Sequence, residues 1–159
     1  MLRLKEILKF INEHEYLREH ILLKGGTAIN LTIFNLPRLS VDIDMDFVPN
    51  YNREVMGLAR EKITQILKEY MLQEGYQLSP VSRFSFSLDA FHFKYLNAGG
   101  NRDSIKVEIN YSLRTHIFEP VKCKILTDIF EDEMEILTLA PMEIFSAKAN
   151  ALMSRAAAR

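Results

Sequence analysis

The sequence predicts a single α+β domain in which helices flank one mixed β-sheet. Segments with helical periodicity alternate with segments of period two. Their order is helix, strand, helix, strand, helix, β-hairpin, strand and helix, which differs from a regular βαβ ladder. The chain has 159 residues, enough for one domain with a buried core, and contains no repeat, low-complexity tract or linker.

Composition excludes several classes of protein. The sequence is 48% hydrophobic and 26% charged, as in soluble globular proteins, and no apolar run approaches the ~20 residues of a membrane span. Charges throughout the first residues argue against a signal peptide. The single Cys123 excludes an internal disulfide and a CxxC metal site, and we expect a reducing cytoplasm as its setting. With a net charge of -1, the chain as a whole does not attract nucleic acid over long distances, although a local basic patch could still bind it.

The first third of the chain predicts two helices and two strands. The chain begins with apolar residues at helical spacing, followed by a short apolar run and a glycine pair. A short apolar segment then ends at Pro37, and after it apolar and polar residues alternate strictly. We expect an amphipathic helix over 2–20, a short strand over 21–23, a short helix from Thr27, as its N-cap, to Asn35, and a strand over 41–48.

The rest of the chain predicts a long helix, several strands and a final helix. The aromatic residues of the expected strands are assigned to the core rather than to a base-stacking platform, because Arg83 and Lys94 are the only cations interleaved with them. The expected elements are a helix over 52–70 ended by Gly75, alternating strand segments over 84–88 and 91–95, a hairpin turn over 97–101, strands over 105–109 and 121–126, and a helix from Pro141 onward.

Three aspartates alternate along the strand predicted over 41–48. Asp42, Asp44 and Asp46 would share one face, with about 6.5–7 Å between neighbours. They fit the solvated face of an edge strand, where charge blocks aggregation. They also fit a divalent-cation site, because Asp is a poor strand former and like charges this close need a cation between them. Oxygen ligands suit Mg²⁺ or Mn²⁺.

A glycine pair and a third acid extend this second interpretation. Gly25 and Gly26 before a short helix favour an anion site, and with nearby metal-binding acids they describe a site for a metal–triphosphate. The expected reaction is in-line phosphoryl or nucleotidyl transfer. Glu108 is the candidate third carboxylate, because the hairpin can fold its strand beside the aspartates; Asp89 and Asp103 are rivals. Glu108 equally fits a solvated residue paired with Lys106 or Arg102.

Residues 22–47, LLKGGTAINLTIFNLPRLSVDIDMDF, resemble the AbiEii/AbiGii toxin family of nucleotidyltransferases, in the DNA polymerase β-like superfamily. A glycine pair is followed after 15 residues by Asp-Ile-Asp-Met, with Lys24 before the glycines and Arg38 and Ser40 before the acids. The likeness continues in IKVEINYSLR and in LTLAPMEIFSAKANALMSRAAAR, where Lys148 and Arg155 match the family's Lys–Arg helix. It implies a polymerase β-like minimal nucleotidyltransferase fold with flanking helices.

The resemblance also implies roles for individual residues. The expected metal ligands are Asp42, Asp44 and Glu108, which with Lys148 form the catalytic set; an exposed helix lysine is the alternative for Lys148. Asp46 lies roughly 13 Å along the strand from Asp42, so a structural or outer-shell role is expected. The expected nucleotide-binding residues are Lys24, Gly25, Gly26, Thr27, Arg38, Ser40 and Arg155.

The family suggests an enzyme toxin of a toxin–antitoxin or abortive-infection pair, with Mg²⁺ or Mn²⁺, NTP as donor, a cognate antitoxin protein and, in some relatives, the tRNA 3′ end as acceptor. Two alternatives stay open: a degenerate NTP-binding module that acts through a protein partner, and transfer to a protein or a small molecule such as an aminoglycoside. We expect one nucleotidyltransferase domain over 1–159 that lacks the C-terminal helical region of the family.

Overall fold

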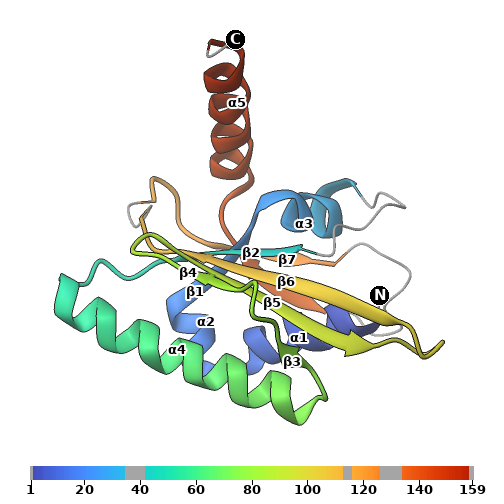
Figure 1. Ribbon diagram of the computed structural model, residues 1–159. Coiled ribbons are helices and arrows are strands. Elements are labelled where there is room, and N and C mark those ends of the chain that lie inside the picture. The colour runs from blue at the N-terminus through green and yellow to red at the C-terminus, as the bar shows by residue number, and fades with distance from the viewer. Residues whose placement is uncertain (1, 35–41, 113–115, 126–133, 158–159) are drawn as a thin grey trace.

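The computed structural model describes residues 2–34, 42–112, 116–125 and 134–157. It contains one eight-stranded mixed sheet with helices on both sides, which confirms the predicted α+β class (Figure 1). The strands are β1 Ile21–Lys24, β2 Asp42–Phe47, β3 Gln77–Leu78, β4 Arg83–Phe84, β5 Leu88–Leu96, β6 Arg102–Asn110, β7 Val121–Lys124 and β8 Glu135–Thr138.

The sheet runs in the order β3-β5-β6-β2-β1-β8-β7, with β4 also paired to β5. Two of its pairs are parallel, β2 with β6 and β1 with β8, while β1 with β2 and β5 with β6 are antiparallel. The predicted hairpin therefore does place the β6 strand beside the aspartate strand β2. This pairing brings together acids that are far apart in the sequence.

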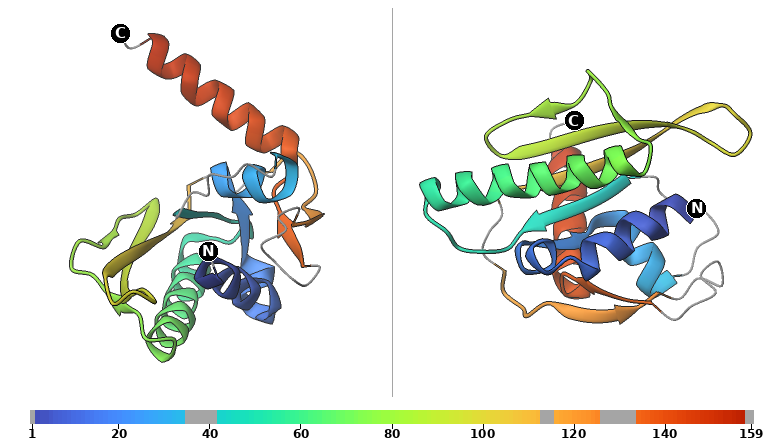
Figure 2. Two further views of the ribbon diagram at one scale, coloured as in Figure 1. Left: turned by 90° about the vertical axis from the view of Figure 1, so that its right-hand side faces the viewer. Right: turned by 90° about the horizontal axis from the view of Figure 1, so that it is seen from below.

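Helices cover the two sides of the sheet unequally. They are α1 Leu2–Glu13, α2 Glu15–His20, α3 Gly25–Ile29 with its π-helical continuation η1 Asn30–Phe34, α4 Arg53–Gln73 and α5 Pro141–Ala157. Figure 1 and both views of Figure 2 place α1, α2 and α4 on one side and α3 and α5 on the other. Helix α5 extends away from the sheet, and its side chains over 145–156 are exposed.

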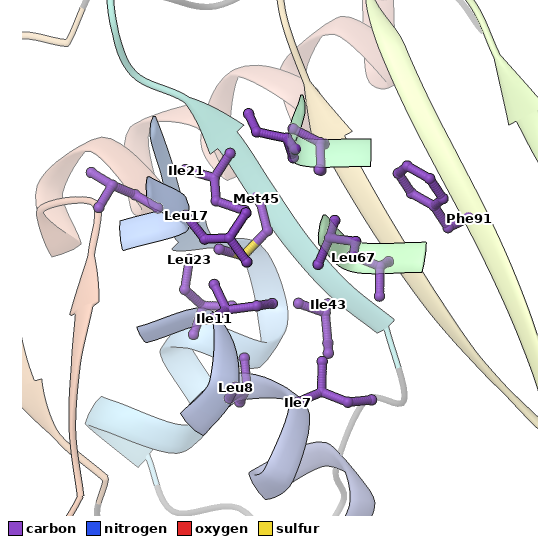
Figure 3. Packing of buried hydrophobic residues seen from close by; sticks show 14 of the residues in the cluster. Ile7, Leu8, Ile11, Leu17, Ile21, Leu23, Ile43, Met45, Leu67 and Phe91 are labelled. Atoms are coloured by element: carbon purple, nitrogen blue, oxygen red, sulfur yellow. The ribbon is translucent and has the colours of Figure 1, made fainter. Parts of the chain in front are cut away.

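The core lies between the sheet and the side covered by α1, α2 and α4. Ile43 and Met45 of β2 are buried there among apolar residues of these helices, such as Ile11 and Leu67 (Figure 3). Because neighbouring strand residues face opposite sides, the same alternation turns Asp42 and Asp44 toward α3 and α5. Phe91 and Phe93 of β5 are core, as predicted, and are only 0% and 2% exposed. Phe84 and Phe86 were also assigned to the core, which was wrong, since they are 49% and 69% exposed.

Several predicted elements differ in the structure. The helix expected over 2–20 is two helices, because the His14 side chain accepts a hydrogen bond from the Leu17 N–H and starts α2. Thr27 is not an N-cap, since the helix begins at Gly25 and the Thr27 hydroxyl donates to the Asp42 carbonyl instead. Asn35 and Pro37 lie outside the described residues.

The strand segment predicted over 84–88 was wrong, and two short strands were missed. The chain reverses between β4 and β5, where the Ser85 N–H donates to the Leu88 carbonyl over 2.9 Å. Strand β3 has two residues, too few for a period-two pattern to be recognised, and the four-residue strand β8 was not assigned. The predicted strands at β1, β2, β6 and β7 and the helices α4 and α5 are present, with Asn52 as N-cap of α4.

Gly75 and Gly100 confirm the predicted ends of a helix and a hairpin. Their φ angles of 80° and 77° lie in the left-handed region that favours glycine. Gly75 follows α4, and Gly100 closes the turn between β5 and β6. Across the described part of the chain, every helix is too short or too polar to cross a bilayer.

Candidate active site

The centre of the site is a row of carboxylates on two neighbouring strands. In the parallel pairing of β2 with β6, Asp44 lies directly beside Glu108 and Asp42 lies beside Lys106. These side chains are half-buried and share the sheet face toward α3 and α5. The structure therefore places the three acids that were predicted to bind metal on adjacent strands and on one face of the sheet.

The environment of Asp44 disfavours its negative charge. Burial raises the pKa of its carboxyl first, and the neighbouring charges of Glu108 and Asp42 raise it further. Lys24 and Lys106 act in the opposite direction without cancelling the shift. A cation at this position would relieve the repulsion, so the electrostatics of the site favour binding one.

Glu108 has a partner of its own. The Lys106 Nζ donates to the Glu108 Oε1 over 2.7 Å, and this hydrogen bond is the main cause that raises the pKa of Lys106. The predicted alternative, a strand Glu paired with Lys106, is thus present in the structure. No three His, Cys, Asp or Glu side chains converge closely enough to hold a metal ion in the ranges that the structure describes. The all-oxygen donor set of Asp42, Asp44 and Glu108 nevertheless suits a hard divalent cation.

The glycine turn lies against the carboxylates. Gly25 has a φ of 75°, and a Cβ at this position would lie 2.3 Å from the Asp44 Oδ2. Only glycine fits this close approach between the turn and strand β2. A Cβ at Gly26 would lie 3.8 Å from the Lys148 Nζ, so helix α5 brings this predicted lysine to the glycine turn although its side chain is otherwise exposed.

Lys24 and Thr27 have contacts within the fold. Lys24 forms an ion pair with Asp46, whose side chain is almost fully buried, which agrees with the structural role expected of that acid. Thr27 is buried and donates to the carbonyl of Asp42. Both residues hold strand β2 in place, and any nucleotide contact by them would come in addition.

Of the remaining predicted residues the structure describes Arg155, which lies away from the site. Arg38 and Ser40 lie outside the described residues. Arg155 is seven positions beyond Lys148 on the extending helix α5, about 10 Å further along its axis. Figure 2 shows that this direction leads away from the sheet.

The two rival acids have other roles. Asp89 is 1% exposed and forms a two-pronged ion pair with Arg60 of α4, and Asp103 accepts a hydrogen bond from the Tyr95 hydroxyl over 3.1 Å. Both side chains are on the opposite sheet face from Glu108. The prediction that Glu108 is the third acid is therefore consistent with the fold.

Sequence reasoning missed two features. Lys106 was named only as a partner of Glu108, yet it also lies beside Asp42; alternation of Lys106 with Glu108 on one strand face was the available signal. The Arg60–Asp89 pair had no signal in the sequence, because its members belong to α4 and β5 and meet only in the packed structure.

Comparisons with known proteins show the family of the chain. No curated protein matches the chain. A solved structure from Thermotoga maritima, of a protein assigned as a nucleotidyltransferase, is similar with 18% sequence identity and a TM-score of 0.45, over 99% of this chain and 93% of that chain. The family model of the nucleotidyl transferase AbiEii toxin of type IV toxin–antitoxin systems matches residues 7–159. With nearly the whole chain matched, the protein belongs to the AbiEii family of nucleotidyltransferase toxins.

Proposed function

We propose that the protein transfers a nucleotide from an NTP to an acceptor hydroxyl, with Mg²⁺ or Mn²⁺ held by Asp42, Asp44 and Glu108. The main support is one arrangement: Asp44 is paired with Glu108 directly beneath a glycine turn that Lys148 also reaches. Carboxylates, an open backbone turn and a lysine are the parts that a metal–triphosphate requires.

Each residue would have a distinct task in this reaction. Gly25 and Gly26 leave room for the phosphates beside the turn, and Lys148 would neutralise charge on the triphosphate. When bound, the metal would polarise the α-phosphate and lower the pKa of the acceptor hydroxyl. Glu108 would accept the hydroxyl proton while the new oxygen–phosphorus bond forms and pyrophosphate leaves.

The acceptor we propose is the 3′ end of a tRNA, and the partner that restrains the activity is a cognate antitoxin protein. The toxin–antitoxin family to which the chain belongs supports the antitoxin partner. The tRNA acceptor rests on the resemblance to relatives that use it. Asp42, Asp44 and Glu108 are half-buried rather than fully buried, which suits an acceptor too large to be enclosed.

Transfer can be tested with α-³²P-labelled nucleotides. The purified protein is incubated with each labelled NTP, Mg²⁺ and total bacterial RNA, beside an Asp42→Ala/Asp44→Ala protein. Label in a tRNA-sized band, only with the unchanged protein, is the expected result and names the donor. Absence of label in RNA with all four nucleotides would contradict the tRNA acceptor.

A second candidate function is a nucleotide-binding module without transfer activity. The observation that favours it is the Lys106–Glu108 ion pair, which occupies the third acid. Calorimetry with NTP separates the two functions: Mg²⁺-dependent NTP binding without transfer to any acceptor would support the module. In that case an Asp42→Ala protein would keep its interaction with a protein partner, whereas an enzyme toxin would lose its effect on growth.

A further inference from the structure

One half of the sheet is open on the side that carries the carboxylates. Helices α3 and α5 lie over the half that contains β1 and β2, while no described helix lies over β4, β5 and β6 on this side (Figures 1 and 2). Lys94, Arg102 and Ser104 are exposed there, as is Arg83. The open half begins at Glu108 and is continuous with the candidate active site.

This open surface is positively charged. Residues opposite each other in the β4–β5 and β5–β6 pairs share a face, which places Arg83, Lys94, Arg102 and Lys106 on the same side as Glu108. We call these four residues the basic face. Glu108 is the only acid on this side in β4, β5 and β6, and the whole chain has a net charge of -1, so the positive charge is concentrated locally.

Most of this charge is not neutralised within the fold. Lys106 pairs with Glu108, but Arg83, Lys94 and Arg102 form no ion pair with any residue in the described part of the chain. Lys94 and Arg102 also line a cavity of about 630 Å³ at the β3 edge of the sheet, where Arg3 and Glu74 from the opposite side contribute one charge of each sign. A polyanion would gain favourable contacts here without displacing internal partners.

The dimensions fit a short length of single-stranded nucleic acid. Arg102 precedes Glu108 by six positions, so the basic face extends about 20 Å along β6 from the carboxylates. No Phe or Tyr belongs to this face of β4, β5 and β6. Contacts would therefore be to phosphates, independent of base sequence, rather than to stacked bases.

We propose that the basic face binds the phosphodiester backbone of the acceptor RNA and leads its 3′ hydroxyl to the carboxylates. The part of this statement that concerns the hydroxyl rests on the proposed transfer function. Binding of the RNA backbone itself follows from charge, exposure and position, and it can be tested without any catalysis.

The test measures binding of a fluorescent single-stranded RNA of about 12 nucleotides over a series of salt concentrations. Two double variants lose the same charge: Lys94→Gln/Arg102→Gln on the basic face, and Arg53→Gln/Lys68→Gln on the exposed side of α4 as the control. The first should bind RNA at least tenfold more weakly, and its slope of log K against log[salt] should fall by about 1.4. The control should match the unchanged protein, and thermal unfolding checks that each variant is folded.

Three results would overturn the proposal: no RNA binding by the unchanged protein, equal weakening in both variants, or an unchanged affinity and slope in Lys94→Gln/Arg102→Gln. Polyglutamate is added as a competitor. If it displaces RNA as well as unlabelled RNA does, the face accepts any polyanion, and assignment to RNA is overturned in favour of an acidic protein.

Failure of the transferase proposal can be distinguished from failure of the RNA-binding proposal, because Mg²⁺-dependent NTP binding and nucleotide transfer are measured on the same proteins. RNA binding that depends on the basic face, without transfer by any protein, supports the RNA surface and contradicts the transferase. Transfer to RNA that is equally fast in Lys94→Gln/Arg102→Gln supports the transferase and overturns the basic face.

Discussion

Gly25 and Asp44 approach so closely that the glycine has no room for a side chain: a Cβ at Gly25 would lie 2.3 Å from the Asp44 Oδ2 and 3.0 Å from its Cβ. The contact joins the turn before α3 to the middle of the carboxylate strand β2. Two parts of one sequence motif, separated by a segment that includes Pro37, are thus in direct contact.

Gly25→Ala should therefore damage both the fold and the site. The φ of 75° is unfavourable for alanine, and its methyl group would displace the Asp44 carboxylate. We expect the free energy of unfolding to fall by about 1–3 kcal/mol and NTP transfer to be lost. Urea unfolding measures the first effect and the labelled-nucleotide assay the second.

Gly26→Ala is the matched control for this change. Its Cβ would meet only the Lys148 Nζ, at the ordinary contact distance of 3.8 Å, and its φ is not in the left-handed region. We expect its free energy of unfolding to stay within about 1 kcal/mol of the unchanged protein. Equal destabilisation by the two alanines would show that the close approach to Asp44 is unimportant.

Asp44→Asn should stabilise the metal-free protein and abolish transfer. At neutral pH the Asp44 charge is half-buried and repelled by Glu108 and Asp42, and asparagine removes that charge at similar volume. We expect a gain of about 1 kcal/mol in urea unfolding with a chelator present. Mg²⁺ should then stabilise the unchanged protein but not the variant.

The gain from Asp44→Asn should depend on pH with a definite sign. Because the pKa of Asp44 is raised on folding, the folded protein binds this proton more tightly than the unfolded chain. The unchanged protein therefore loses stability as the pH rises from the ordinary Asp pKa, about 3.9, through the raised value. The difference between the two proteins should be small near pH 4 and largest at pH 7; a difference that shrinks toward neutral pH would contradict the assignment.

Lys148→Met should weaken nucleotide binding without affecting stability. The side chain is exposed apart from its approach to Gly26, so its removal costs the fold little. A lost charge-assisted contact to phosphate should raise the KM for NTP about tenfold. Lys122→Met, an exposed lysine of β7, is the control and should leave KM unchanged. Equal KM values in both variants would mean that Lys148 is an ordinary surface lysine.

Arg60→Met should destabilise the protein strongly, for a reason unrelated to catalysis. It leaves the Asp89 carboxylate, 1% exposed, without its ion pair, which typically costs about 3–5 kcal/mol. Arg60→Met/Asp89→Leu should recover most of this loss, because no charge is then left buried. Urea unfolding of both variants checks the difference. A double variant as unstable as the single one would place the cost in packing rather than in charge.

The sequence by itself determined much of the fold class and the candidate site. Period-two and helical patterns identified the long helix α4, the hairpin and the strands β2 and β6, because extended amphipathic segments carry a strong local signal. Asp42, Asp44 and the glycine pair were found from a local conflict: acids are poor strand formers, and such conflicts mark functional sites. Glu108 was selected from the hairpin that precedes it.

The tertiary structure decided which of these residues meet. Only the parallel pairing of β2 with β6 sets Asp44 beside Glu108, and only the placement of α5 in the fold brings Lys148 to Gly26. The pairing of β5 with β6 sets Asp89 on the face opposite Glu108. Asp103 is also on that face, because it lies five positions from Glu108 on the same strand. Register and strand order arise from contacts between residues distant in the chain, so local periodicity does not contain them.

The basic face shows the same division. A net charge of -1 and scattered lysines and arginines give no sign of a nucleic-acid surface in the sequence. Three strand pairings align four of these cations on one open side of the sheet, next to the carboxylates. The sequence determined the residue types and their local spacing. The sheet determined their assembly into a charged surface, because the register between neighbouring strands decides which residues share a face.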